Sequence, residues 1–388
     1  MGLHGIARRL RTALRGLHRT LGLGLGALFA LTGLSGSVLV FYQEIDAELH
    51  PALHTSAVTE PIVWEEVLQS LRREFPAMDG AWRLELDTRK GAVAARYYAT
   101  PQAQARGFAP VMAWVDPARQ RVLRAEVWGE YAMTWAYDLH YRLLLGEPGA
   151  VLMGLAGLAL LVLLLSGLCA WWPRSGSWRK ALRAKPHAAP LRRLHDLHKI
   201  AGLASLPVLL VLVITGVMLD LPQQTRSLAA VFSPLTEMPS PASSPPTGNR
   251  ISVDAAIARA LLRFPDARAA WIETPSAQSD VYRVRLQQPG EPGGRFPHTW
   301  VWLDASTGAL LAAHDPLAGS AGDTLLRWLH PLHSGEALGM GGRVLVCAAG
   351  LLPAGLFITG WMRQRIRRRA EKKARLRVKA ASTDQGVG

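Results

Sequence analysis

AVLMGLAGLALLVLLLSGLCAWW, residues 150–172, contains no charged side chain over 23 consecutive positions. As a helix, such a segment is long enough to cross a bilayer hydrocarbon core of about 30 Å. Three further runs, 21–42, 200–221 and 341–362, share this pattern and carry charged residues only near their edges. Backbone N–H and C=O groups exposed to lipid must form their hydrogen bonds within their own segment, so each run is expected to be helical. The sequence therefore predicts four transmembrane helices and excludes an ordinary soluble enzyme.

The charge of the chain is divided between the segments that these runs separate. The chain as a whole carries +15, which in a soluble protein would suggest a nucleic-acid binder. Residues 1–20, 173–199 and 363–388 carry +5, +7 and +8, whereas the long segments 43–148 and 222–340 carry −4 and −1. Short loops rich in Lys and Arg stay in the cytoplasm. We therefore expect both termini inside, the long segments outside, and a basic tail that contacts membrane lipids and no nucleic acid.

The two halves of the chain repeat each other with only small changes in offset. Each half reads helix, outer domain, helix, and both halves enter the membrane from the same side. The predicted repeat is therefore parallel, with its pseudo-two-fold axis along the membrane normal. The Ser/Thr-Gly pairs of the repeat are interpreted as positions where helices pack closely. The matched stretches are Leu17-His18-Arg19 with Leu197-His198-Lys199 (offset 180), Trp114-Val115-Asp116 with Trp302-Leu303-Asp304 (188), and Leu139-His140 with Leu332-His333 and Ser166-Gly167 with Thr359-Gly360 (both 193).

Each long segment has the plan of a small α+β domain. Helical apolar spacing at 63–74 and 252–263 is followed in both cases by alternating, strand-like stretches. A helix followed by a small antiparallel sheet forms a compact α+β module. The predicted organisation is an N-terminal segment 1–20, a first span 21–42, a first outer domain 43–149, a second span 150–172, a loop 173–199, a third span 200–221, a second outer domain 222–340 with a Pro/Ser-rich linker 239–250, a fourth span 341–362 and a basic tail 363–388.

Several of these motifs together resemble those of a known family. They are Leu-His-Arg before the first span, Leu-His-Lys before the third, Leu-His-Tyr-Arg-Leu-Leu-Leu-Gly146 before the second, and Trp-Val-Asp-Pro117 and Trp-Leu-Asp-Ala-Ser-Thr-Gly308 in the outer domains. Over nearly its whole length the chain resembles the PepSY-associated transmembrane (PepSY-TM) proteins, which include iron-regulated membrane proteins and siderophore reductases of bacterial inner membranes.

This resemblance implies a mainly α-helical membrane protein with two periplasmic PepSY-like domains and cytoplasmic termini. It also implies a haem-dependent oxidoreductase that reduces periplasmic ferric siderophores or other Fe(III) chelates and so releases iron. Some relatives carry a C-terminal flavin reductase domain. Because 26 residues follow the fourth span here, we expect a separate cytoplasmic or membrane electron donor.

The repeat selects four of the twelve histidines as candidate haem ligands. Only His18 with His198, and His140 with His333, occupy equivalent positions in both halves. The sequence has no Cys-x-x-Cys-His, which excludes c-type haem, whereas b-type haem needs only axial ligands and an apolar slot. The first pair precedes outward-going spans and the second precedes inward-going spans, so each pair lies at one face. We predict two b-type haems, an inner one on His18 and His198 and an outer one on His140 and His333.

Some choices remain open at the level of sequence. His195 is an alternative to His198, and His330 is an alternative to His333, each three residues away on the same helix. Arg142 and Arg343 are candidate partners of a haem propionate or of the chelate. The outer segments are mildly acidic, so an anionic chelate would need local help, for instance from Arg142.

A function of a different class is also open. PepSY modules occur in protease propeptides, where they look inhibitory. The alternative function is therefore a membrane protein that binds peptides or proteases in a regulatory role, without redox activity.

Overall fold

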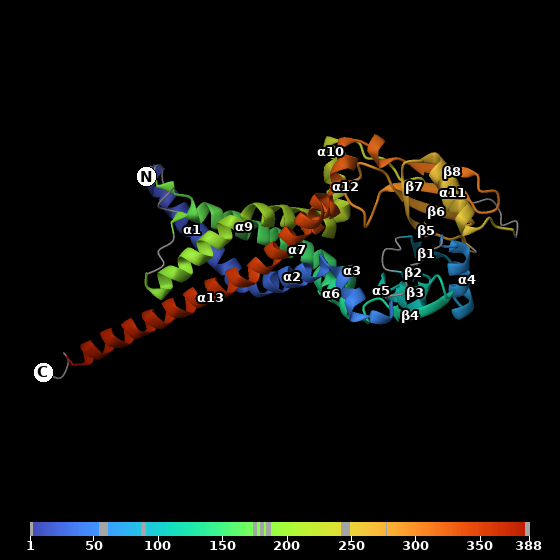
Figure 1. Ribbon diagram of the computed structural model, residues 1–388. Helices are drawn as coiled ribbons and strands as arrows, with labels where there is room; N and C mark the ends of the chain where they lie inside the picture. The colour runs from blue at the N-terminus through green and yellow to red at the C-terminus, as the bar shows by residue number, and fades with distance from the viewer. Residues whose placement is uncertain are drawn as a thin grey trace. The chain divides into compact units, whose positions relative to one another are not determined.

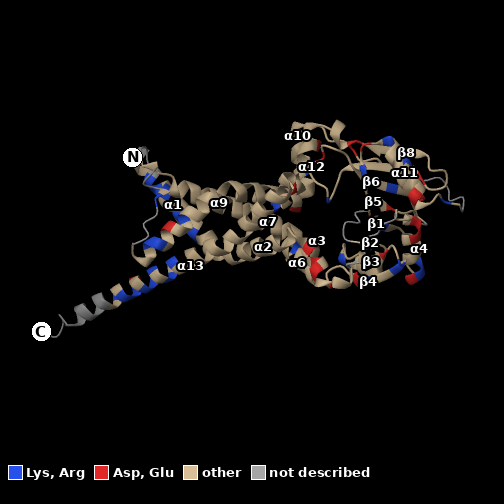
Figure 2. Ribbon diagram, viewed as in Figure 1, with Lys and Arg blue, Asp and Glu red and all other residues tan. Residues whose placement is uncertain are grey.

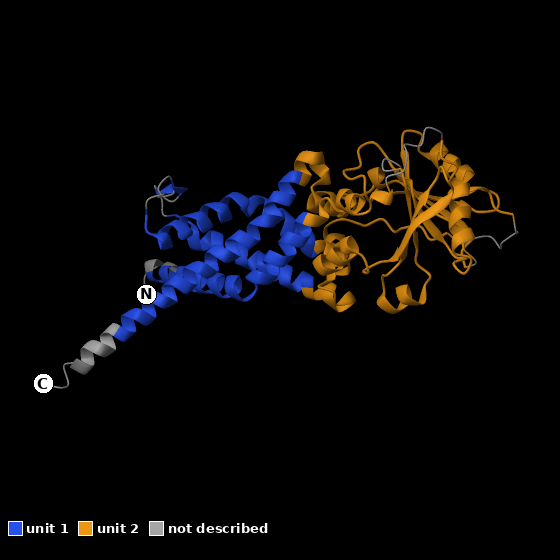
Figure 3. Cartoon of the chain, turned by 60° about the horizontal axis from the view of Figure 1, so that its bottom comes forward, with its two compact units in different colours: residues 1–37, 153–217, 344–388 blue, residues 38–152, 218–343 orange. Residues whose placement is uncertain are grey.

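The computed structural model describes residues 3–53, 61–86, 91–173, 177–178, 182–183, 188–241, 249–276 and 278–384. The central part of the predicted linker, 242–248, and much of the loop 173–199 lie outside these ranges. The chain divides into two compact units, each assembled from separate stretches of sequence (Figure 3). Unit 1 contains residues 1–37, 153–217 and 344–388, and unit 2 contains residues 38–152 and 218–343.

Unit 1 is built from long apolar helices. Its helices are α1 (Leu3–Gly24), α2 (Gly26–Leu39), α7 (Gly146–Trp171), α9 (Pro190–Asp220) and α13 (Gly339–Asp384), of which α2, α7, α9 and α13 extend at one end into unit 2. Within the described residues, three of them are long and apolar enough to cross a membrane, and the bent pair α1–α2 forms a fourth candidate span. The prediction of a mainly helical, multi-pass membrane protein is confirmed.

The first candidate span differs from the straight helix expected over 21–42. α1 and α2 meet at Leu25 with a bend of 60°. The bend falls in the glycine-rich stretch Gly22-Leu-Gly-Leu-Gly26, where helix propensity is low. Gly26 also packs directly on Phe357 of α13, because a Cβ atom placed on Gly26 would overlap that ring. Glycine therefore permits both the bend and the close approach.

Small residues bring the helices of unit 1 together. A Cβ on Gly33 of α2 would collide with the carbonyl oxygen of Gly350 on α13, and a Cβ on Gly350 would collide with Ser37. The Ser37 hydroxyl donates a hydrogen bond of 2.8 Å to the Cys347 carbonyl of α13. Close backbone approach and interhelical hydrogen bonds are the usual means by which helices associate in lipid.

Unit 2 contains one eight-stranded antiparallel sheet with the order β4-β3-β2-β1-β5-β6-β7-β8. The sequence suggested two separate small sheets, but β1 and β5 pair, so the two four-stranded halves form a single sheet. This pairing covers an edge that each half would otherwise expose. The strands are β1 (Trp82–Glu85), β2 (Val93–Tyr97), β3 (Val111–Asp116), β4 (Arg121–Val127), β5 (Arg268–Glu273), β6 (Val281–Gln287), β7 (Thr299–Asp304) and β8 (Leu310–His314).

Two helices, α4 (Trp64–Glu74) and α11 (Val253–Arg263), cover one face of the sheet and enclose the main hydrophobic core (Figure 1). Each helix supplies the other with an N-terminal cap. The Asp254 carboxylate accepts hydrogen bonds from the backbone N–H groups of Trp64 and Glu65, and the Glu65 carboxylate accepts one from Val253. Carboxylates at helix N-termini satisfy free N–H groups and favour the helix dipole.

Unit 2 also contains shorter helices, some of which pack against the other face of the sheet. These are α3 (Tyr42–Leu49), α5 (Pro101–Arg106), α6 (Ala132–Arg142), α10 (Pro222–Phe232) and α12 (Ala321–Ser334), with 3₁₀ turns at Pro51–Leu53, Pro316–Ala318 and Glu336–Leu338. A second apolar cluster lies here, in which Tyr42 of α3 and Tyr131 before α6 join Trp114 of β3. The Tyr42 and Tyr131 hydroxyls share a hydrogen bond of 3.0 Å.

Candidate haem-ligating histidines

Two histidines meet inside unit 1, and we name His18 and His198 the bundle pair. His18 lies on α1 and His198 on α9. The centroids of the two rings are 6.1 Å apart, and the ring planes are 82° apart. The structure therefore brings together two side chains that are 180 positions apart in the sequence.

Hydrogen bonds at Nδ1 orient both rings of the bundle pair. The Nδ1 atom of His18 lies 3.0 Å from the Leu163 carbonyl oxygen of α7, which can only accept, so Nδ1 carries the proton. The Nδ1 atom of His198 lies 2.9 Å from the Thr359 hydroxyl of α13, which itself donates to helix carbonyls, so Nδ1 donates there as well. His198 also has a backbone hydrogen bond with Leu356. Both rings therefore keep a lone pair on Nε2, the form that binds a metal.

A glycine lies beside each ring of the bundle pair. A Cβ atom on Gly167 of α7 would stand 2.8 Å from Cε1 of His18, closer than real side chains approach. A Cβ on Gly360 of α13 would stand 3.6 Å from Cε1 of His198, which is an ordinary contact. Gly167, Thr359 and Gly360 of the two Ser/Thr-Gly pairs thus contact the histidines, which the interpretation as helix-packing positions did not include. Their equal offset of 193 was the signal that could have revealed it.

A second pair, His140 and His333, meets in unit 2, and we name it the corner pair. His140 lies near the end of α6 and His333 near the end of α12. The ring centroids are 6.2 Å apart and the ring planes 52° apart. Among the described residues, these two pairs are the only His–His ring contacts.

Tight turns place the corner pair where a short helix meets a long one. After α6 the chain passes through left-handed residues to Gly146, where α7 begins, and after α12 it passes through Gly335 to Gly339, where α13 begins. A Cβ on Gly149 would overlap the Arg142 carbonyl, and a Cβ on Gly342 would overlap the Gly335 carbonyl. Both corners therefore depend on glycine at equivalent positions.

The separations in both pairs fit two imidazoles on one iron. An imidazole nitrogen binds a first-row metal at about 2 Å, and the ring centre lies about 1 Å further out, so two axial rings have centroids about 6 Å apart. The measured 6.1 and 6.2 Å match this spacing. Among the described residues there is no cluster of three or more metal-ligating His, Cys, Asp or Glu side chains. A haem would need only the two axial ligands, because its porphyrin supplies the other four.

The alternative ligands have different surroundings. The His330 ring packs against Phe296 with centroids 4.8 Å apart. Burial, together with the nearby Arg295 guanidinium, lowers the pKa of His330 to about 3, so this ring is neutral at physiological pH. His195 has a buried Nδ1 atom without a hydrogen-bond partner among the described residues.

The two candidate arginines are already bound to carboxylates. Arg142 forms an ion pair of 2.9 Å with Glu147. Arg343 forms one of 2.8 Å with Glu44 and also donates to the Val40 carbonyl. Both guanidiniums therefore have structural roles within unit 2, and a propionate or chelate would have to compete with those partners.

A family model described as "PepSY-associated TM region" matches residues 15–365, which is most of the chain. The chain belongs to this PepSY-associated family. An uncharacterized protein of Pseudomonas aeruginosa, PA4219, is 32% identical over 145 residues, covering 34% of this chain and 36% of that protein. The aligned part thus spans about a third of the relative, whose name assigns it no activity.

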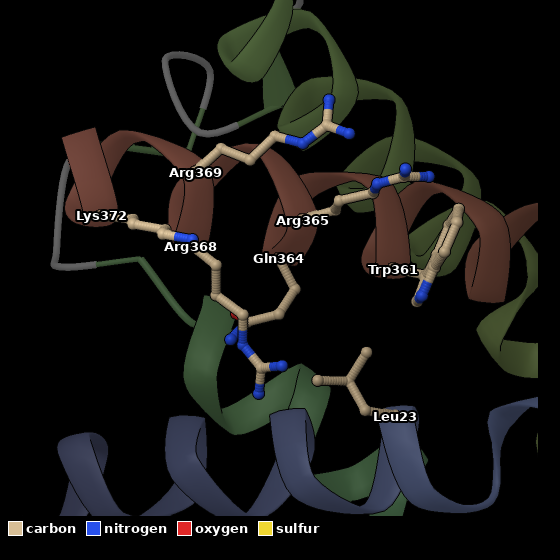
Figure 4. A pocket seen from close by; sticks show the side chains of 7 residues that line it. All are labelled: Leu23, Trp361, Gln364, Arg365, Arg368, Arg369 and Lys372. Carbon is tan, nitrogen blue, oxygen red and sulfur yellow. The ribbon is translucent and has the colours of Figure 1, made fainter.

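A basic cavity of about 510 Å³ lies in unit 1 between α1 and α13 (Figure 4). Lys and Arg residues are concentrated at this end of α1, α9 and α13 (Figure 2). Trp361 forms one apolar wall, with the Arg365 guanidinium 5.2 Å from its ring centroid. An aromatic residue beside several cations is typical of a membrane interface. The cavity is lined by Leu23, Trp361, Gln364, Arg365, Arg368, Arg369 and Lys372.

Proposed function

We propose that this PepSY-associated protein is a di-haem b electron-transfer protein of a bacterial inner membrane, which reduces periplasmic ferric chelates such as ferric siderophores. The observation that carries the proposal is the pair of matched histidine sites, with centroid separations of 6.1 and 6.2 Å. One chance contact between two interfacial histidines would be unremarkable. Two contacts, each formed by repeat-equivalent residues, favour cofactor ligation.

The proposal includes two parallel repeats, with both termini in the cytoplasm. Several equivalent contacts support the repeat. The reciprocal caps come from Glu65 and Asp254, and Asp116 and Asp304 each accept backbone hydrogen bonds in the turn after a strand. The charge distribution supports the orientation through the positive-inside rule. In this topology the bundle pair lies toward the cytoplasm, the corner pair lies toward the periplasm, and the basic cavity contacts anionic lipid headgroups.

In this proposal each residue has a defined task. His18 and His198 would bind one haem through Nε2, while Leu163 and Thr359 hold the Nδ1 protons and so fix the ring orientations. His140 and His333 would bind the second haem. Bound haem would supply one-electron transfer. The apolar helices exclude water around the bundle pair, and the substrate iron takes one electron in passing from Fe(III) to Fe(II), which weakens its binding to hard oxygen ligands.

The test is a visible spectrum of the purified full-length chain, oxidised and then reduced with dithionite. We expect b-type bands with two haems per chain, and reoxidation of the reduced protein by a ferric chelate. Reduced protein that no ferric chelate reoxidises would exclude the reductase activity. A chain purified without any Soret band would exclude the haem sites and favour the alternative, a regulatory protein that binds peptides or proteases.

A further inference from the structure

One arginine of the sheet lacks the carboxylate partner that its neighbours have. Arg285 lies on β6, on the sheet face opposite α4 and α11, and forms neither an ion pair nor a hydrogen bond among the described residues. Its Nε atom is buried without a partner. On the same face, Arg83 and Arg283 both bind Glu273, at 2.7 and 3.0 Å. A shielded guanidinium whose N–H groups bind no acceptor is unfavourable for stability alone, which makes Arg285 a candidate for binding a ligand.

The neighbours of Arg285 across the sheet are both tryptophans. The register pairs Arg285 with Trp271 on β5 and with Trp300 on β7. The guanidinium carbon lies 5.9 Å from the ring centroid of Trp271 and 4.4 Å from that of Trp300. We name these three residues the Trp–Arg–Trp row. A guanidinium that packs on aromatic faces keeps its N–H groups in its own plane, where they can bind a carboxylate or phenolate.

The surroundings of the row carry an excess of positive charge. The guanidiniums of Arg83 and Arg96 also lie over Trp271, at 5.6 and 4.8 Å. Arg83 is neutralised by Glu273 and Arg96 by Glu85, whereas Arg285 has no carboxylate in direct contact and is balanced only at longer range by Glu291. Burial, and then the charge of Arg83, lower the pKa of Arg285 to about 10, so it remains a cation at neutral pH. The row is therefore positive within a segment, 222–340, whose sequence charge is −1.

A chain of ring contacts joins the row to the helix that carries the corner pair. Trp271 lies 5.9 Å from Phe296, and Phe296 lies 4.8 Å from His330, measured between ring centroids. His330 is three residues before His333 on α12, so the two lie on one side of that helix. Consecutive ring contacts therefore connect the row to the helix that carries His333.

We propose that the Trp–Arg–Trp row binds the substrate as an anionic aromatic Fe(III) chelate, with phenolate or catecholate oxygens on Arg285 and its aromatic rings against Trp300. This inference rests on the proposed function, since it names the substrate class of that reductase. It also replaces Arg142 as the source of local positive charge, because Arg142 is bound to Glu147. Neutral aliphatic chelates offer neither the charge nor the aromatic face and are poor ligands for this row.

The experiment measures binding without redox chemistry. Gallium(III) forms complexes of the same charge and shape as Fe(III) but is not reduced under these conditions. The full-length protein in detergent is titrated calorimetrically with tris(catecholato)gallium(III), a planar-ligand trianion, and with tris(acetohydroxamato)gallium(III), which is neutral. We expect the catecholate complex to bind at least about tenfold more tightly, as charge-assisted hydrogen bonds contribute.

Two variants on the same strand and the same face separate a specific site from general charge. Arg285→Gln is expected to weaken binding of the catecholate complex about tenfold or more, whereas Arg283→Gln, whose parent side chain is bound to Glu273, should change it less than about twofold. Arg285→Lys keeps the charge but loses the planar fork, and should lie between the wild type and Arg285→Gln. If circular dichroism shows that Arg285→Gln does not fold, Arg285→Lys replaces it as the test variant.

Three results would overturn the inference: unchanged binding by Arg285→Gln, equal losses in Arg285→Gln and Arg283→Gln, or equal affinity for the two gallium complexes. The proposed function fails in a different way. If the catecholate complex binds through Arg285 but no ferric chelate reoxidises the reduced protein, the binding site is supported and the reductase activity is excluded. If ferric chelates are reduced and Arg285→Gln has no effect on their binding, the reductase activity is supported and the binding site at Arg285 is excluded.

Discussion

The bundle pair and the corner pair have nearly the same ring separation but are held in different ways. His18 and His198 lie within long apolar helices, and carbonyl or hydroxyl oxygens of two other long helices bind their Nδ1 atoms. His140 and His333 lie at the ends of short helices, directly before turns that depend on glycine. The first pair is thus fixed by helix packing and the second by local turns and caps. Changes in the two regions should therefore affect the two sites separately.

Under the proposed function, the largest expected effect is the loss of one haem at a time. His18→Ala or His198→Ala should lower the haem content from two to one per chain, and His140→Ala or His333→Ala should do the same for the other site. One remaining axial ligand seldom retains b-type haem at full occupancy. The measurement is haem per protein by the pyridine haemochrome method.

The alternative ligands provide the matched controls for these variants. His195→Ala and His330→Ala are expected to retain two haems. Retention of both haems in His198→Ala, with loss in His195→Ala, would move the ligand assignment to His195. If all four ligand variants retained both haems, these histidines would be excluded as haem ligands.

A smaller effect should distinguish the two rings of the bundle pair. Gly167→Ala places a methyl group against the His18 ring, at 2.8 Å from Cε1. The overpacking should lower the free energy of unfolding by about 1–3 kcal/mol and also lower the occupancy of this haem. Gly360→Ala is its repeat-equivalent control, because 3.6 Å to His198 is an ordinary contact. The reduced spectrum and a thermal melt report both effects. Equal losses in the two variants would show that glycine matters here only for helix packing.

The amino-acid sequence is sufficient to predict the long apolar helices and the partners within each histidine pair. Hydropathy depends on composition alone, and the repeat offsets by themselves match His18 with His198 and His140 with His333. The bend at Leu25 was not predicted, because a glycine-rich apolar run is compatible with either a straight or a broken helix. The joining of the two half-sheets was also missed, since β1 and β5 are separated by about half the chain and nothing local specifies their pairing.

The parts of the site that sequence reasoning missed are those that depend on tertiary contacts. The Leu163 carbonyl that binds His18 is a backbone group, and any residue type would supply it. Arg283 and Arg285 are two residues apart, so both side chains lie on the same face of β6. In the sequence alone nothing distinguishes them. Only the packed sheet shows that Glu273 binds Arg283 and leaves Arg285 without a direct ion pair.

A subtler change should alter the potential of one haem without removing it. Thr359→Val removes the hydroxyl that accepts the Nδ1 proton of His198. Hydrogen bonding at Nδ1 makes the imidazole a stronger electron donor, so its loss should raise the reduction potential of this haem. The haem of the corner pair serves as an internal reference in the same spectroelectrochemical titration. A shift of both potentials together would indicate a general change in the protein rather than the loss of this contact.

The smallest expected effect concerns the helix that carries the corner pair. Ser320 and Asp323 form a capping box at the start of α12, and Asp323 also accepts hydrogen bonds from Thr236. Burial alone would raise the pKa of Asp323, but the hydrogen bonds from Thr236 and Ser320 outweigh it and lower the pKa to about 2. Because the folded pKa is below the unfolded value of about 3.9, this stabilisation is present above about pH 4 and is lost as the pH falls toward 2.

Asp323→Asn should therefore destabilise α12 by about 1 kcal/mol at neutral pH and flatten the acid dependence of unfolding between pH 4 and 2. Since α12 carries His333 and no residue of the bundle pair, the haem of the corner pair should be released first on acidification of the variant. Asp266→Asn, at an exposed position of the same unit, is the control. Simultaneous release of both haems would show that the two regions unfold as one. Helix packing and local caps would then not stabilise the two sites independently.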